Sequence, residues 1–421
     1  MKPLRIIARS DNAPAPFAEI ARELEALLNS AGESGAVDAI DAALRHAAEH
    51  RATDLHLEPW EDCTAMRFRI DGILHDVARL PRPQHPRMVA RVKILARMVT
   101  YQRDMPQDGR IDAGAASCKR AVRVSTFPTV NGERVVLRIM EGGDTLLDLD
   151  TLGFDVGVAA QLRALINRPQ GTLLLTGPSS SGKTTTIYSL LQELLSRRAP
   201  APHVVTVEDP VERRLPGMAQ TEIAPHQGFT FEAALRSLLR QDPEVIMVGE
   251  IRDADTARTA IQAGLTGHLV VSTIHSGTAA GVFTRLLDMG VEPYLAASSV
   301  TGVLAQRLVR KVCVMCAQPY EPDAVLLRAY GIDGGGGTFV RGAGCAACQF
   351  IGYRGRTALG ELLCVSGAFA ERVLERPRTT ALHESAVHAG MRPLAVAAAQ
   401  LVRDGITTVE ELQRVLPPAA P

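Results

Sequence analysis

A glycine-rich segment, Gly177 to Thr184, carries the most specific chemical signal in this sequence. It follows the apolar run 171–176 and precedes a helix-like stretch over 185–195, which is the order strand, phosphate loop, helix. Small residues let successive backbone N–H groups turn toward one polyphosphate, while Lys183 supplies a compact charge and the Thr184 hydroxyl is placed to ligate magnesium. The alternative, a Gly/Ser-rich turn that opens an ordinary helix, does not explain the complete motif. The nucleotide-binding residues that we predict are Gly177, Pro178, Ser179, Ser180, Ser181, Gly182, Lys183, Thr184 and Thr185.

Acidic residues end two further apolar runs, and the carboxyl ends of parallel strands form the ligand-binding edge of an α/β sheet. We predict that Glu250 is the general base that acts on the attacking water; the alternative is a surface carboxylate at a strand end. Glu208 ends the run 203–209 together with Asp209, where it would orient water or the metal shell. The alternative for this pair is a turn cap that leads into the next proline.

Two histidines, His268 and His275, flank another apolar run. Because side chains alternate along a strand, these two rings point to opposite faces, and only one of them can face the nucleotide directly. His275 stands at the carboxyl end and is the better candidate for the site. For His268, a structural and a functional role remain equally open.

Several arginines have spacings that suit the binding of a phosphate. Arg236 and Arg240 are four residues apart in a helix-like stretch and therefore share one helix face. Arg123 and Arg138 lie on strand-like runs in an earlier part of the chain. A solvated charge is the ordinary role of a surface arginine. Phosphoryl transfer nevertheless gains from a guanidinium on the developing γ-phosphate charge, which another domain or subunit often supplies.

Four cysteines form two C-x-x-C pairs, Cys313 with Cys316 and Cys345 with Cys348, separated by 28 residues. Two such pairs make a closed tetrahedral zinc site without an open position for catalysis. A redox pair is the weaker alternative. The remaining cysteines stand alone, and we expect packed thiols at Cys63, Cys118 and Cys364.

The overall composition narrows the function classes. Acidic and basic residues balance at 46 each, so no net field draws the chain to nucleic acid or to an anionic bilayer. Aromatic residues make up only 4%, which argues against stacking platforms for single strands. No apolar run approaches the ~18 residues of a membrane span, and the start lacks a signal peptide's apolar core. We expect a cytoplasmic protein without a nucleic-acid partner, and any association with a membrane must come through other proteins.

The 421 residues are enough for two or three domains. Strands alternate with helices around the glycine-rich segment, which predicts an α/β fold, and short alternating runs before it predict a smaller α+β domain. The expected division is a short N-terminal arm at 1–35, a small α+β domain at 36–141, a linker at 142–155, a P-loop ATPase domain at 156–309, a tetracysteine subdomain at 310–360 and a helical C-terminal region at 361–421.

Together these motifs resemble the secretion ATPase superfamily, which powers type II secretion and type IV pilus assembly. The stretch 207–212 is similar to its Asp box, 249–253 to its unusual Walker B motif and 268–275 to its His box. The resemblance covers about 370 residues and also includes the cysteine pairs. Its other matching segments are 54–59, 67–72, 106–110, 124–129, 131–138, 306–310, 352–356 and 404–408.

The resemblance implies a RecA-like ATPase domain and a homohexameric ring that uses ATP, magnesium and structural zinc. Closure of the small domain on the nucleotide would then displace an inner-membrane platform protein, and family members also dock on a membrane-anchored assembly protein. By the same analogy the four arginines Arg123, Arg138, Arg236 and Arg240 would meet the γ-phosphate. We therefore expect a type II secretion motor. Pilus assembly is the close alternative, and a DNA-handling translocase or a nucleotide-gated scaffold is a more distant one.

Overall fold

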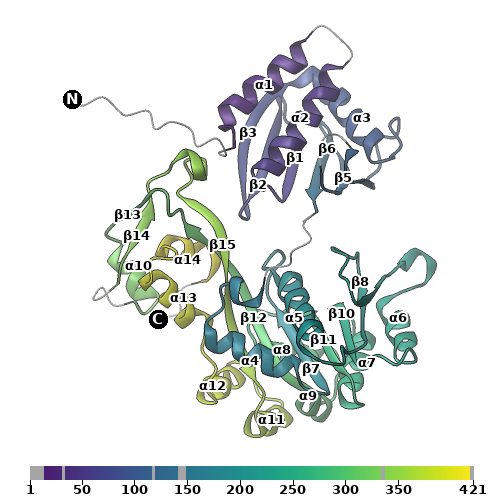
Figure 1. Cartoon of the computed structure of the whole chain (residues 1–421), viewed down its shortest axis with the longest axis vertical. Helices are drawn as coiled ribbons and strands as arrows, with labels where there is room; N and C mark the ends of the chain where they lie inside the picture. The colour runs from purple at the N-terminus through teal and green to yellow at the C-terminus, as the bar shows by residue number, and fades with distance from the viewer. Residues whose placement is uncertain (1–13, 31–33, 116–118, 141–147, 333–336, 418–421) are drawn as a thin grey trace. The chain divides into compact units, whose positions relative to one another are not determined.

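The computed structural model describes residues 14–30, 34–115, 119–140, 148–332 and 337–417 (Figure 1). The chain divides into two compact units. The N-terminal unit comprises residues 1–143 with 313–318 and 342–355, and the C-terminal unit comprises 144–312, 319–341 and 356–421.

The N-terminal unit contains a six-stranded antiparallel sheet in the order β3-β2-β1-β6-β5-β4. Strand β5 shows why these segments form a half-buried sheet: Val122 and Val124 are buried, while Arg123 between them is exposed. The strands are β1 (Asp54–Pro59), β2 (Cys63–Ile70), β3 (Ile73–Pro81), β4 (Gln107–Ile111), β5 (Val122–Thr129) and β6 (Gly132–Ile139). The helices are α1 (Phe17–Asn29), α2 (Gly35–Glu49) and α3 (His85–Leu95).

Helix α1 belongs to the core of this unit, although the sequence suggested a separate arm over residues 1–35. Its buried side chains Ile20, Leu24 and Leu28 recur every four residues and form one apolar stripe. This stripe is part of the same apolar cluster as helix α2 and the buried face of the sheet. The segment is too short to form a domain of its own, and its residues alone do not show which surface its apolar stripe packs against.

The C-terminal unit is built on a seven-stranded sheet in the order β15-β12-β7-β11-β10-β8-β9 (Figure 1). The pairs from β12 to β9 are parallel, as the alternation of strands and helices predicted. The strands are β7 (Gly171–Thr176), β8 (Val204–Glu208), β9 (Met218–Glu222), β10 (Val245–Ile251), β11 (Leu269–Ile274), β12 (Val300–Val312) and β15 (Tyr353–Cys364). The helices before β12 are α4 (Val156–Ile166), α5 (Lys183–Arg197), α6 (Phe231–Leu238), α7 (Ala254–Leu265), α8 (Gly281–Asp288) and α9 (Pro293–Ser299).

The central strands of this sheet are apolar throughout because helices cover both of its faces. Along β7, Leu173 and Leu175 belong to one apolar cluster, while Leu174 belongs to the cluster on the opposite face. Strands β10 and β11 alternate in the same way. The predicted α/β fold with a smaller α+β domain before it is confirmed.

The region after β12 differs from the expected subdomain at 310–360. Its cysteine-bearing segments, 313–318 and 342–355, group with the N-terminal unit, whereas 319–341 groups with the C-terminal unit. Both cysteine segments adjoin long strands of the large sheet, since β12 ends at Val312 and β15 begins at Tyr353. The smaller elements here are β13 (Ala317–Pro319), α10 (Ala324–Ala329) and β14 (Val340–Gly342).

The predicted helical C-terminal region is present. It consists of α11 (Gly367–Leu374), α12 (Thr379–His388), α13 (Leu394–Arg403) and α14 (Val409–Val415). At the N-terminal side of this unit, residues 149–151 form a short 3-10 helix in which Leu149 is buried. These residues belong to the segment that the sequence suggested as a linker. Among the described helices, none is long and apolar enough to cross a membrane.

Candidate functional site

The glycine-rich segment joins the end of β7 to the start of α5 and has a backbone that only glycine permits at two points. Gly177 has φ of 147° and Gly182 has φ of 86°. A Cβ atom added at Gly177 would lie 2.4 Å from the Gln306 carbonyl oxygen, and one at Gly182 would lie 2.9 Å from the Gln306 side-chain nitrogen. Strand β12, which carries Gln306, therefore closes against this loop without room for a side chain. The loop has the strand-to-helix geometry that presents backbone N–H groups to phosphate.

Lys183 is the first residue of α5 and turns back over the loop. Its Nζ atom donates to the carbonyl oxygens of Gly177 and Pro178, each at 3.0 Å. Burial lowers the pKa of Lys183 below its ordinary value, while the negative charge of Glu250 acts in the opposite direction. The loop carbonyls thus hold the ammonium group, and the charge of Glu250 favours its protonated form, which fits a residue that meets the outer phosphates of a nucleotide.

Residues from four segments line a cavity of about 490 Å³ beside this loop. Ser179 comes from the phosphate loop, Glu250 from β10 and His275 from the residue that follows β11. Parallel strands β10 and β11 are neighbours, so their carboxyl ends bring Glu250 and His275 to one edge, as the sequence predicted. Ile251, Arg252 and Arg285 complete the lining.

The Glu250 carboxylate contacts two basic side chains in this cavity, those of His275 and Arg252. The Nε2 atom of His275 lies 3.5 Å from one carboxylate oxygen of Glu250. The other oxygen pairs with the guanidinium of Arg252, which also lies 3.3 Å from a carboxylate oxygen of Asp209. Hydrogen bonding to Glu250 raises the pKa of Arg252 above its ordinary value. The Glu250 side chain is 21% exposed, so water reaches it.

Glu208 has a different environment from Glu250. It is only 2% exposed and accepts hydrogen bonds from the Tyr188 hydroxyl, from Thr206 Oγ1 at 2.5 Å and from Gln220 Nε2 at 3.1 Å. Burial, together with the hydrogen bond to Glu208, raises the pKa of Tyr188. Because three protein groups already occupy this carboxylate, the arrangement favours a positioning role for Glu208 over the direct role that the sequence suggested.

The two histidines lie at opposite ends of β11 and have different surroundings. His275 lines the cavity, whereas the Nδ1 atom of His268 lies 3.2 Å from the Ala263 carbonyl oxygen at the other end of β11. This contact supports the structural alternative for His268.

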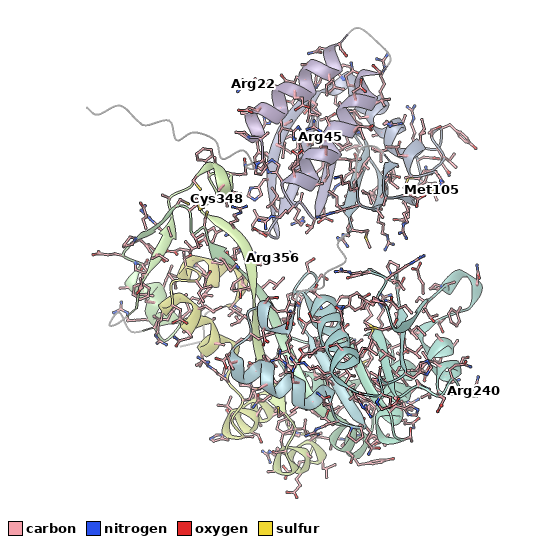
Figure 2. All side chains as sticks on the ribbon, in the orientation of Figure 1. Arg22, Arg45, Met105, Arg240, Cys348 and Arg356 are labelled. Carbon is pink, nitrogen blue, oxygen red and sulfur yellow. The ribbon has the colours of Figure 1, made fainter. Side chains whose placement is uncertain are left out.

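The four predicted arginines do not line the described part of this cavity. Arg236 forms an ion pair with Glu232 at 2.7 Å, and Arg240, labelled in Figure 2 near α6, donates to the Arg236 carbonyl at 3.1 Å. Arg123 and Arg138 are cross-strand neighbours on β5 and β6 of the N-terminal unit. The Nε atom of Arg138 lies 2.9 Å from an Asp54 carboxylate oxygen.

Two further arginines near the loop were not singled out from the sequence. Arg285, on α8, lines the cavity. Arg307, on β12, donates to the Gly277 carbonyl at 3.2 Å, and burial lowers its pKa. Neither residue belongs to a phosphate-binding motif. For Arg307 the signal was its place in the matching segment 306–310, and for Arg285 it was a position in the helix that follows His275.

The four paired cysteines form one cluster, as predicted. Their ligand atoms all lie within 4.8 Å of one another, and Sγ–Sγ distances are 3.9 Å for Cys313 to Cys345 and 3.8 Å for Cys316 to Cys348. A tetrahedron with zinc–sulfur bonds of ~2.3 Å has edges of about 3.8 Å, so the cluster fits a zinc ion. Backbone N–H groups of Cys345 and Gly352 lie 3.2 and 3.3 Å from the Cys348 sulfur and stabilise a thiolate there.

The cysteines outside the two C-x-x-C motifs were expected to be packed thiols, and the two that the structure describes fit this expectation. Cys63 is buried and Cys364 packs beside an apolar cluster; burial raises the pKa of both thiols. Cys118 lies outside the described residues.

Comparison with known proteins identifies relatives over most of the chain. A family model described as type II/IV secretion system protein matches residues 29–414. The type II secretion system ATPase E of Vibrio cholerae is 43% identical over 403 residues, which cover 95% of this chain and 79% of that protein. The type II secretion system protein HxcR of Pseudomonas aeruginosa is 43% identical and covers 93% of this chain and 80% of that protein.

A pilus protein is also among the relatives. The type IV pilus assembly ATPase PilB of Thermus thermophilus is 39% identical over 90% of this chain and 43% of its own length. Among solved structures, the Legionella pneumophila ATPase DotB aligns with a TM-score of 0.66 at 19% identity, over 89% of this chain and 94% of that one. The pilus retraction motor PilT with bound ADP aligns with a TM-score of 0.62 at 24% identity, over 90% and 97%. These two likenesses support the fold.

Proposed function

Because the chain belongs to the type II/IV secretion system protein family, we propose that it is a magnesium-dependent ATPase motor that drives type II protein secretion. The observation that carries this proposal is the cavity in which Ser179 of the phosphate loop meets Glu250 and His275. Hydrolysis of a nucleoside triphosphate requires a loop that binds the phosphates and, beside it, a carboxylate that can contact the attacking water.

Each residue of the site has a distinct proposed task. The loop N–H groups and Lys183 hold the phosphates, and the Thr184 hydroxyl ligates magnesium, which supplies charge neutralisation when bound. Glu250 takes the proton of the attacking water. His275, 3.5 Å from Glu250, orients that carboxylate, and Arg252 holds it in the ion pair seen here. Glu208 acts indirectly by fixing Tyr188 on α5, the helix that begins at Lys183.

The four-cysteine cluster is proposed to hold a structural zinc ion. The sulfur spacing matches a tetrahedral site, and two backbone N–H groups support a thiolate at Cys348. A zinc ion there would join the end of β12 to the start of β15, and all four positions would be filled by protein.

The motor is proposed to work as a homohexamer on the cytoplasmic side of the inner membrane. There it would act on a platform protein and dock on a membrane-anchored assembly protein of the secretion machine. In this arrangement Arg123 and Arg138 of the small domain, with Arg236 and Arg240, would approach a γ-phosphate when domains or neighbouring subunits close. All four arginines are exposed in the separate units, and the ion pairs of Arg138 with Asp54 and of Arg236 with Glu232 would have to be exchanged for the phosphate.

Pilus assembly is the second candidate function, and the relative from Thermus thermophilus favours it. Deleting the gene in its host separates the two candidates. We expect exported proteins to accumulate in the periplasm, and we expect the wild-type gene, but not a Glu250→Gln copy, to restore their release. Loss of surface pili with normal protein export would instead support the pilus function, and an unchanged phenotype in both assays would refute the proposal.

A further inference from the structure

The N-terminal unit contains a cavity of about 180 Å³ that has no part in the nucleotide chemistry above. It lies between the start of helix α3 and the turn of the β5–β6 hairpin (Figure 1). Pockets for organic ligands usually measure at least about 300 Å³, so this cavity suits a smaller guest. Its lining combines apolar residues of α3, such as Val89 and Ala90, with two arginines, a histidine and a glutamate.

The histidine in this lining, His85, has one ring nitrogen without a partner. His85 is 2% exposed, and its Nε2 atom lies 2.8 Å from the Glu133 carbonyl oxygen. A carbonyl oxygen only accepts, so Nε2 carries the proton of this hydrogen bond. Burial lowers the pKa of His85, which keeps the ring neutral and leaves Nδ1 as an acceptor. Nδ1 is buried and has no hydrogen-bond partner among the described residues, so a guest of the cavity that donates a hydrogen bond would satisfy it.

Two arginines bring positive charge to the same cavity. A Cβ atom added at Gly132 would lie 3.7 Å from the Cδ2 atom of His85 and 3.9 Å from the Nη1 atom of Arg82, so the hairpin turn, the ring and the guanidinium converge. Arg82 also donates to the Asn131 carbonyl. The second arginine, Arg103, is exposed. Within the described part of the chain, neither arginine forms an ion pair with a carboxylate, so both can bind an anion.

The glutamate of this cavity does not cancel that positive charge, because it has a cation of its own. A carboxylate oxygen of Glu133 lies 2.5 Å from the Nζ atom of Lys93. Lys93 is fully buried and also donates to the Gln102 carbonyl at 2.6 Å. With Glu133 neutralised by Lys93, the guanidiniums of Arg82 and Arg103 determine the charge of the cavity. The cavity therefore suits a small anion that also carries a hydrogen-bond donor.

The combination of guanidiniums with an acceptor nitrogen discriminates among small oxyanions. Sulfate carries no proton at neutral pH, so it has nothing to donate to His85 Nδ1. A phosphate monoester loses its second proton near pH ~6 and then lacks a donor in the same way. Hydrogen phosphate keeps one O–H at neutral pH, and it therefore offers a donor to the histidine and charged oxygens to the arginines.

We propose that this cavity binds hydrogen phosphate, with His85 Nδ1 accepting from its O–H and with Arg82 and Arg103 donating to its oxygens. Every lining residue belongs to the N-terminal unit, so the inference does not depend on the proposed ATPase function. Hydrolysis of ATP releases this same ion. The site would thus bind a product of the proposed reaction in the unit that does not contain the phosphate loop.

The test measures binding of radiolabelled inorganic phosphate to the full-length chain by equilibrium dialysis. All proteins carry Lys183→Ala, which removes the phosphate clamp of the nucleotide cavity. We expect one saturable site that prefers inorganic phosphate to sulfate by at least about tenfold, since sulfate would leave a buried acceptor unpaired. In competition at about pH 8, glycerol phosphate should displace the label as weakly as sulfate does, because its phosphate group is then a dianion.

Further substitutions in this background test the individual contacts. Arg103→Gln should weaken phosphate binding by at least about tenfold, the worth of one charge-assisted hydrogen bond. Arg87→Gln is the matched control and should leave binding unchanged, because Arg87 is an exposed arginine of α3 that does not line the cavity. His85→Phe removes the acceptor and should make the affinities for phosphate and sulfate similar. If this variant does not fold, the selectivity of the parent chain still tests the role of His85.

The outcomes decide this inference separately from the proposed function. Loss of phosphate binding in Arg103→Gln, with binding retained in Arg87→Gln, would support the site. A parent chain that binds no phosphate would overturn the inference and leave the ATPase proposal untouched. Equal affinity of the parent chain for phosphate and sulfate would also overturn it, because His85 would then not accept from the ligand. Unchanged binding by Arg103→Gln would overturn it as well, since the ion would then lie outside this cavity.

Discussion

The contrast between Glu250 and Glu208 gives the sharpest prediction about the site. Both carboxylates follow the same sequence pattern, yet Glu250 is 21% exposed in the cavity while Glu208 is 2% exposed with three hydrogen-bond donors. Replacing each by glutamine keeps the side-chain shape. The change therefore removes a proton acceptor in one case and part of a buried network in the other.

For Glu250→Gln we expect a large loss of turnover and little loss of stability. A general base contributes about 10²- to 10⁴-fold in rate, which corresponds to about 3–5 kcal/mol of activation free energy. The phosphate loop and Lys183 are unchanged, so ATP should still bind. For Glu208→Gln we expect mainly a loss of stability, about 1–3 kcal/mol in the free energy of unfolding. The new amide would present a hydrogen-bond donor to groups that are themselves donors.

The assay is magnesium-dependent phosphate release at saturating ATP, with urea unfolding measured on the same samples. The reasoning is refuted if Glu250→Gln retains more than about a tenth of wild-type turnover, since no general base would then be lost. It is also refuted if Glu208→Gln is as stable as the wild type and as inactive as Glu250→Gln, because Glu208 would then act directly on the reaction.

Three other predictions concern the rest of the chain. Lys183→Ala should abolish ATP binding by removing the cation that the loop carbonyls hold; a binding titration that matches the wild type would contradict this. Zinc should be found by elemental analysis of the purified chain, and its chelation or Cys313→Ser should lower the melting temperature; a metal-free wild type of equal stability would end the zinc proposal. Burial of Glu411 raises its pKa, but hydrogen bonds from Arg414 and Arg310 outweigh this and lower it below the ordinary 4.5. The ionised Glu411 carboxylate therefore stabilises the fold at pH values above 4.5, and this stabilisation is lost as the pH falls through the lowered pKa. When unfolding is measured as a function of pH, Glu411→Gln should remove this loss of stability at acid pH.

The parts of this protein that were predictable are those encoded in short, contiguous patterns. The phosphate loop needs glycines at fixed positions beside a lysine, and the metal cluster needs two C-x-x-C pairs. Both sites could therefore be predicted from the sequence without knowledge of the three-dimensional fold. The parallel arrangement of the central strands followed from the alternation of apolar strands and helices, although the sequence did not give the number of strands. His275 could be preferred to His268 because strand alternation and the carboxyl-edge rule are both local.

The rest depends on tertiary contacts that no local pattern reveals. Glu208 and Glu250 look alike in sequence and differ only in what surrounds them, namely Tyr188 and Gln220 in one case and the cavity in the other. Glu361 is connected to Ala279 and Leu394, which lie 82 and 33 residues away in the chain. Helix α1 was assigned to an arm because its packing partners could not be read from its own residues.

The most direct test of the account is the rate of magnesium-dependent ATP hydrolysis by the purified chain, wild type beside Lys183→Ala and Glu250→Gln. The account predicts steady turnover in the wild type, no ATP binding in the first variant, and bound but unhydrolysed ATP in the second. Equal turnover in all three proteins would contradict it, because hydrolysis would then not occur at this site.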